Sequence, residues 1–128
     1  MLQINPPGNF MFNPVGPIKM IDAQARARVF PFNKPCPSIE QLEQVKLGDF
    51  VKIGLEGFHP VYSAANRPED HQGGEQFGLQ VIGTGGSGYI GVLQNELKNY
   101  ILRKGIVVSF EQRNILDILT LEDYERLP

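Results

Sequence analysis

Residues 76–94 read QFGLQVIGTGGSGYIGVLQ, and this stretch decides the fold. Before the glycine-rich centre at 85–88, apolar side chains recur at every second position, at Phe77, Leu79 and Val81. After that centre, Ile90 and Val92 alternate with Tyr89, Gly91 and Leu93. A period of two is typical of β-strands, and a glycine-rich turn between two such runs is typical of a hairpin. The stretch therefore predicts two antiparallel strands joined by a tight turn.

The glycines of this turn also fit the spacing G-x-G-x-x-G, at Gly83, Gly85 and Gly88. In a dinucleotide-binding loop, that fingerprint opens a helix whose N-terminus faces the pyrophosphate. Here the following residues alternate as a strand, so the hairpin explains the glycines without a ligand.

Outward from the hairpin, further strands are expected at Phe50 to Leu55 and at Ile106 to Phe110, with a last strand or turn at 114–119. Together these segments predict a compact β-rich unit from Leu47 to Ile118. Sheets of four to six short strands usually curl to limit their edges. We therefore expect an α+β fold, with a small, strongly curled antiparallel sheet or half-open barrel and one or two short helices.

Helices are predicted at three places. Ser38 and Gln41 fit a capping box before a short helix at 39–45. Residues 95–103 are expected to be helical because apolar side chains recur at i, i+3 and i+4, and 121–127 form a charged helical tail. For residues 20–30, the alternation of Ala with Gln and Arg favours a strand, whereas the helix propensity of those residues leaves a short helix as the alternative.

The N-terminal part of the chain differs from the rest. Seven of the ten prolines lie in the first 37 residues, and proline interrupts regular structure. Residues 1–17 are interpreted as an extended arm that packs on the body or on a partner, because it carries Phe10, Met11, Phe12 and Val15. Residues 18–128 are interpreted as a single β-rich domain.

Length and composition exclude several classes of protein. The 128 residues suffice for one domain that folds without metal or disulfide, and Cys36 is the only cysteine. The net charge of −2 argues against a dedicated nucleic-acid binder. No apolar run is long enough for a membrane span, and the first residues lack the features of a signal peptide. These features predict a cytoplasmic protein without a cofactor.

Residues 57–74 form a long connection rich in turn-forming residues, and such loops are often functional. His59, Asp70 and His71 are of the types that bind metals or transfer protons, but the spacing lacks a helix or strand to fix them, which favours a polar loop. Tyr62 and Arg67 are of the types that dominate protein interfaces. The candidate binding residues are therefore His59, Tyr62, Asn66, Arg67, Asp70 and His71, with no catalytic and no metal-ligating residue.

Four segments share the features of one sequence pattern. They are residues 47–53 (LGDFVKI), 74–81 (GEQFGLQV), 88–95 (GYIGVLQN) and 104–110 (KGIVVSF), closed by NILDI at 114–118. Together they resemble a group of small bacterial domains of unknown function. The group's pattern reads vGDxVKl, gExfWvxV, gxyxGxLxN and kxGdxVxF, and this chain carries Gly78 at the position of the tryptophan. Some related domains are grouped with immunity proteins of bacterial toxin systems. The resemblance implies a β-rich interaction domain, with immunity as one use.

The leading hypothesis is a non-enzymatic protein that blocks or sequesters a macromolecular partner, as an immunity protein or an inhibitor from a phage or mobile element would do. The expected partner is a toxin or host protein, and a homodimer formed through the N-terminal arm is a further expectation. A small-ligand or nucleotide-binding module using the sheet mouth and the 57–74 loop is the alternative. A single-stranded nucleic-acid binder would use strand aromatics such as Phe50, Phe77, Tyr89 and Phe110.

Overall fold

The computed structural model describes residues 3–4, 10–14, 16–30, 32, 36–85 and 88–125. Its strands are β1 (Gln3–Ile4), β2 (Phe10–Phe12), β3 (Lys19–Met20), β4 (Phe50–Glu56), β5 (Glu75–Gly85), β6 (Gly88–Leu93), β7 (Val107–Glu111) and β8 (Asp117–Leu119). The α-helices are α1 (Ala23–Val29), α2 (Ile39–Glu43) and α3 (Leu121–Glu125), with short 3-10 turns η1 (Pro68–Asp70) and η2 (Gln112–Asn114).

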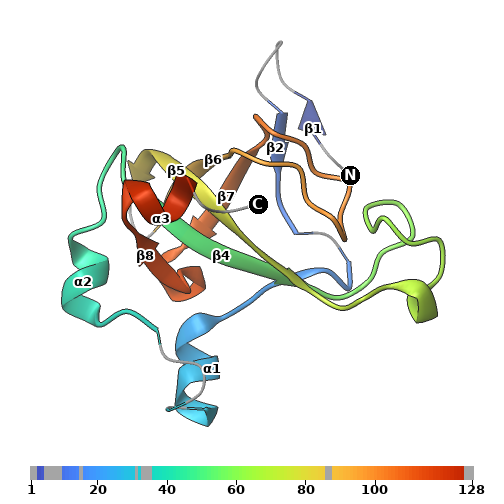
Figure 1. The fold of residues 1–128 in the computed structure, drawn as a ribbon, viewed down its shortest axis with the longest axis horizontal. Helices are drawn as coiled ribbons and strands as arrows, with labels where there is room; N and C mark the ends of the chain where they lie inside the picture. The colour runs from blue at the N-terminus through green and yellow to red at the C-terminus, as the bar shows by residue number, and fades with distance from the viewer. Residues whose placement is uncertain are drawn as a thin grey trace.

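Within these residues the strands form one sheet in the order β1-β2-β7-β6-β5-β4-β3, and β8 also pairs with β4. Neighbouring strands are antiparallel except for β2 and β7, which are parallel. The sheet curls through 247°, so the predicted half-open barrel with a few short helices is confirmed. Figure 1 shows the long strands β4 and β5 crossing the centre, with α1 and α2 beside them.

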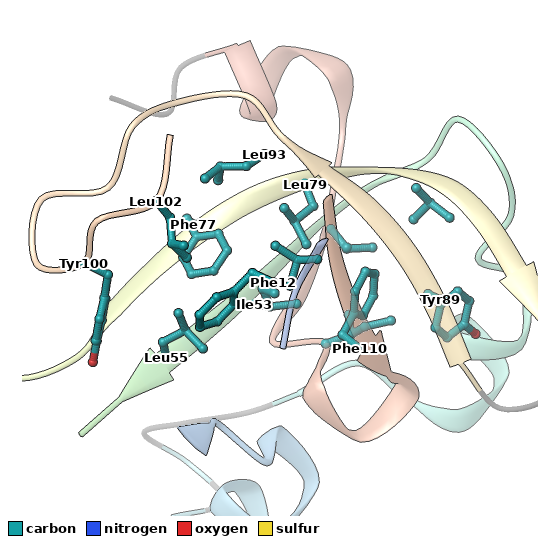
Figure 2. Packing of buried hydrophobic residues seen from close by; sticks show 14 of the residues in the cluster. Phe12, Ile53, Leu55, Phe77, Leu79, Tyr89, Leu93, Tyr100, Leu102 and Phe110 are labelled. Atoms are coloured by element: carbon teal, nitrogen blue, oxygen red, sulfur yellow. The ribbon is translucent and has the colours of Figure 1, made fainter. Parts of the chain in front are cut away.

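The core lies inside the curl. Val51, Ile53 and Leu55 of β4 are fully buried, as the alternation in the sequence predicts, and they face Leu79 and Phe77 of β5. Figure 2 shows these side chains in one continuous cluster that extends from Tyr100 at one end to Tyr89 at the other. The burial is therefore contributed mainly by one face of each strand, as expected of a curled sheet.

The predicted β5–β6 hairpin is confirmed. Gly85 pairs with Gly88, and the register shifts between Val81 and Gly83, where a bulge increases the local twist. The two central turn residues, 86 and 87, lie outside the described residues. Because β6 begins at Gly88, the last glycine of the fingerprint, the chain continues there as a strand and not as the helix that a dinucleotide-binding loop requires.

The N-terminal arm contributes strands to the sheet of its own chain. Met11 and Phe12 of β2 pair in parallel with Val107 and Val108 of β7, while β1 pairs with the other edge of β2. Phe12 is only 1% exposed and lies in the middle of the core (Figure 2). The described part of the arm therefore belongs to the sheet and the core of its own chain. Val15 lies outside the described residues.

Two predictions of local structure are wrong. The strand expected at 20–30 is the helix α1, which was the alternative, and Asp22 caps it by accepting a hydrogen bond from the Ala25 N–H at 2.9 Å. The helix expected at 95–103 is an irregular segment whose N–H groups bind elsewhere. By contrast, α2 begins with the predicted capping box, in which Ser38 and Gln41 bind each other's main chain.

The C-terminal part returns the chain to β4. After η2, the Leu116 N–H donates to the Lys52 carbonyl at 2.7 Å, and β8 then pairs with residues Phe50 to Lys52. The helical tail predicted at 121–127 is present as α3 over residues 121–125, and residues 126 and 127 lie outside the described residues. Of the helices among the described residues, none is long and apolar enough to cross a membrane.

Candidate functional site

The loop at 57–74 and the segment at 94–104 meet at one end of the sheet, which we call the clasped end. Ser63 and Tyr100 form a bridge between them. On its two sides, the Ile101 N–H donates to the Tyr62 carbonyl at 2.8 Å and the Ala64 N–H donates to the Asn99 carbonyl at 2.9 Å. In Figure 1 the yellow-green loop and the orange segment lie at the same side of the molecule. The long loop is thus fixed by main-chain pairing.

Glu75, the first residue of β5, holds the second segment in place. One of its carboxylate oxygens accepts hydrogen bonds from the Lys98 N–H at 2.8 Å and the Asn99 N–H at 2.7 Å, and the other accepts from the Lys98 N–H at 2.9 Å. The Asn99 side chain donates to the Gly74 carbonyl at 3.2 Å. Charge-assisted bonds of this kind are about twice as strong as neutral ones, so Glu75 is the main anchor of residues 98–99.

Tyr100 belongs to the second segment of the clasped end, and its side chain is buried, with 2% of the residue exposed. Its hydroxyl donates to the Gly57 carbonyl at 2.9 Å, which ties the second segment to the start of the loop. Burial, together with the nearby carboxylates of Glu56 and Glu75, raises the pKa of the Tyr100 phenol to about 12. The neutral phenol is therefore the form that the fold requires.

This raised pKa predicts alkaline destabilisation. The unfolded phenol has a pKa of 10.0 and the folded one of about 12, so the folded state holds the proton more tightly. The contribution of Tyr100 is present in full below pH 10 and is lost as the pH rises toward 12. Urea unfolding across this range should show a steeper loss for the natural protein than for Tyr100→Phe, which cannot ionise. Parallel curves for the two proteins would contradict the assignment.

Among the predicted site residues, His59 and Tyr62 face inward. The His59 N–H donates to the Ser63 hydroxyl at 2.9 Å, and its Nδ1 accepts from the Val61 N–H at 3.0 Å. Its ring lies 5.0 Å from that of the buried Tyr62, which contacts Phe12 edge-on at 6.1 Å. Both side chains therefore support the shape of the loop.

His71 also stabilises the loop, through contacts with aromatic rings. Its ring packs edge-on against Phe58 at 5.8 Å and against Tyr100 at 5.4 Å, and its buried Nε2 has no hydrogen-bond partner among the described residues. The contacts of this imidazole are thus aromatic and structural.

Asn66, Arg67 and Asp70 point the other way, since all three are exposed at the tip of the loop. The Arg67 Nε donates to the Asp70 carboxylate at 3.0 Å and lies 3.5 Å from the Glu69 carboxylate. The six predicted residues therefore divide into an inward and an outward set. Where side chains are described, no group of three or more His, Cys, Asp or Glu residues could hold a metal ion.

Sequence reasoning missed a hollow of about 300 Å³ between the start of β5 and residues 95–99. Its walls include Gln72, Gln76, Gly78, Asn95, Leu97 and Asn99. A second hollow of about 330 Å³, bounded by Ala64, Ala65, Asp70, His71, Gln72, Lys98 and Asn99, adjoins it. The incorrect helix prediction for 95–103 concealed these residues, although the polar run QNELKN at 94–99 marks the segment as exposed.

Two exposed apolar residues of the clasped end were also missed. Val61 is 62% exposed and Ile101 is 54% exposed. The hydrogen bond between the Ile101 N–H and the Tyr62 carbonyl brings their two segments side by side.

Comparison of the chain with protein-family models, with curated proteins and with solved structures found no match.

Proposed function

We propose that this is a non-enzymatic binding protein that blocks or sequesters a protein partner, and that the clasped end makes the contact. The observation that carries the proposal is that the 57–74 loop is a fixed surface. Main-chain bonds at Tyr62 and Ala64 and the buried side chains of Tyr62 and Ser63 hold it against the sheet. A surface that is rigid before binding loses little conformational entropy when the complex forms.

The chemistry of this surface suits a protein interface. Val61 and Ile101 offer exposed apolar area, and the tip places Asn66 and Arg67 in solvent nearby along the loop. Protein interfaces combine an apolar centre with a polar rim, and arginine is enriched among their energetically dominant residues. A toxin or a host protein inhibited by this domain is the class of partner that the proposal implies.

Other classes have less support. Of the four strand aromatics that a single-stranded nucleic-acid binder would expose, Phe77, Tyr89 and Phe110 are buried in the core and Phe50 is half-buried. A homodimer formed by strand pairing of the arm would have to use β1, the two-residue strand at the end of the sheet, because β2 pairs with β1 on one side and with β7 on the other. The protein-inhibitor proposal needs neither an exposed aromatic face nor a free edge of β2.

The test is affinity capture with the double variant Val61→Asp/Ile101→Asp. A partner bound stoichiometrically by the natural protein should bind the variant at least tenfold more weakly, because buried carboxylates at the centre of an interface are strongly unfavourable. Leu121→Asp is the matched control, since Leu121 is 55% exposed on α3. Its partner affinity should be unchanged.

Retention of the partner by the double variant would contradict the proposed surface. Purification with a bound small molecule and without any stoichiometric protein would contradict the proposed function itself, and would favour the small-ligand alternative. Thermal unfolding of each variant shows whether it is folded.

A further inference from the structure

One edge of β5 is open at the clasped end. The β5–β6 pairing ends at Leu79 and Leu93, whereas β5 itself begins four residues earlier at Glu75. Among the described residues, 75–78 therefore pair with β4 on one side and have no β6 residue opposite them on the other. On the other side the chain after Leu93 moves away from β5 and returns at Lys98 and Asn99, where Glu75 binds it.

The register shows which main-chain groups face this gap. The Lys52 and Gly54 carbonyls of β4 accept hydrogen bonds from Leu116 and Ile21, on the side away from β5. The main-chain N–H and C=O groups of successive residues in a strand point to alternate sides. The main-chain groups of Val51, Ile53 and Leu55 therefore point toward β5. Their partners there are Leu79, Phe77 and Glu75. The intervening residues of β5, Gln76 and Gly78, consequently point away from β4 and into the gap.

The Val81 hydrogen bonds agree with this assignment. The Val81 N–H donates to the Asp49 carbonyl at 2.8 Å, and its carbonyl accepts from the Gly48 N–H at 2.8 Å. Val81, Leu79 and Phe77 are each two positions apart along β5, so the main-chain N–H and C=O groups of all three point toward β4. The main-chain groups of Gln76 and Gly78 therefore point away from β4.

The segment across the gap uses its main-chain donors elsewhere. The Leu97 N–H donates to the Leu102 carbonyl at 3.1 Å, and the Lys98 and Asn99 N–H groups donate to Glu75. The space between the two segments is the hollow of about 300 Å³ described above. That volume lies at the lower limit of sites that hold drug-sized ligands, so the hollow admits a short segment.

We propose that this hollow binds a short extended peptide segment of the protein partner, which pairs with the main chain of β5 at Gln76. The inference rests on the proposed function and specifies how the partner is recognised. An open strand edge offers alternating N–H and C=O groups, and an extended peptide is the ligand that matches this alternation.

The side chains around the hollow fit a peptide better than an anion. Phe77 and Leu97 supply apolar area for one side chain, while Gln72, Asn95 and Asn99 supply amides that both donate and accept hydrogen bonds. A phosphate or another anion would meet the Glu75 and Glu96 carboxylates, which also line the hollow. A neutral peptide main chain avoids that repulsion.

The test uses random heptapeptides displayed on phage and selected against the full chain. A synthetic peptide of the enriched sequence should bind the natural protein and should shift the NMR signals of the Gln76 and Gly78 amides. Asn95→Trp fills the hollow with a large ring and should weaken binding at least tenfold. Glu40→Trp places the same ring on the exposed side of α2, away from the hollow, and should bind the peptide normally.

A scan of N-methylated peptides tests the pairing itself. In strand pairing, N–H groups alternate between the partner strand and the opposite side. Methylation of one peptide nitrogen should therefore reduce binding at least tenfold, while methylation of the next nitrogen should have little effect. This scan uses the natural protein, so it remains decisive even if Asn95→Trp fails to fold.

Failure to enrich any peptide, unchanged binding by a folded Asn95→Trp variant, or N-methyl effects without alternation would each overturn this inference. The outcome is separable from that of the proposed function. A partner that is lost by Val61→Asp/Ile101→Asp but retained by Asn95→Trp would leave the binding function standing and remove the peptide site.

Discussion

Phe12→Ala is expected to lower the free energy of unfolding by about 3–5 kcal/mol, the usual cost of deleting a fully buried phenylalanine ring. Phe12 is 1% exposed and belongs to β2, a strand of only three residues. Its ring packs edge-on against Tyr62, the buried residue beneath the 57–74 loop. The truncation would therefore leave a cavity between the arm, the core and the loop.

Urea unfolding measures this effect. Asn13→Ala is the matched control, because Asn13 is the next residue and is exposed. Its effect should stay within about 0.5 kcal/mol, as for most surface substitutions. A loss of less than 1 kcal/mol for Phe12→Ala would show that the arm does not belong to the core in solution.

Gly57→Ala is expected to lower the free energy of unfolding by about 3 kcal/mol or more, for two separate reasons. Gly57 has a φ of +99°, which L-residues adopt only with strain of about 1–3 kcal/mol. A Cβ added there would also collide with the Pro17 carbonyl oxygen and would lie 3.2 Å from the Ile18 Cα. Overpacking of this kind typically costs a further 1–3 kcal/mol. The neighbouring Tyr100 hydroxyl, which binds the Gly57 carbonyl, would be displaced as well.

Gly73→Ala separates the two reasons. Gly73 has a similar φ of +88°, but a Cβ added there meets nothing within 4 Å. Its cost should be that of the backbone strain alone, so the difference between the two variants measures the close crossing of residues 17 and 57. Equal losses for the two variants would show that the chain can move apart at this crossing.

The sheet could be predicted because its determinants are local. The glycine-rich turn places β5 beside β6 without information from distant residues, and each strand shows its buried face as alternation at every second residue. The capping box at Ser38 and Gln41 is likewise complete within four residues. These patterns specify structure through chemistry between neighbours in the chain.

The two incorrect predictions have a different origin. Residues 23–29 alternate, but seven alanine, glutamine, arginine and valine residues form a helix once Asp22 supplies the cap. Residues 95–103 carry apolar residues at helical spacing, yet Glu75, twenty-three positions before Lys98, captures the N–H groups that a helix would use. Tertiary hydrogen bonds of this sort have no signature in the segment itself.

The candidate site shows the same division. The location of an unusual loop at 57–74 could be read from its turn-forming residues, but the orientation of its side chains could not. Aromatic and imidazole groups such as Tyr62 and His71 were chosen as binding residues because of their chemistry, whereas packing turns them inward. The hollow at Gln76 arises where one ladder ends before its strand does, and only the register of three strands reveals it.

The pairing of β2 with β7 has a consequence for biosynthesis. Met11 meets Val107, so β2 cannot form its pairing with β7 until a residue 96 positions later in the chain has been synthesised. Contacts between such distant parts of a sequence form slowly, because a long loop must close before they gain any energy. During that interval Phe12 lacks the strand pairing that holds it in the core, and the apolar residues of the arm remain available to chaperones. The pairing that holds β2 in the sheet therefore forms only after β4, β5 and β6 have been synthesised.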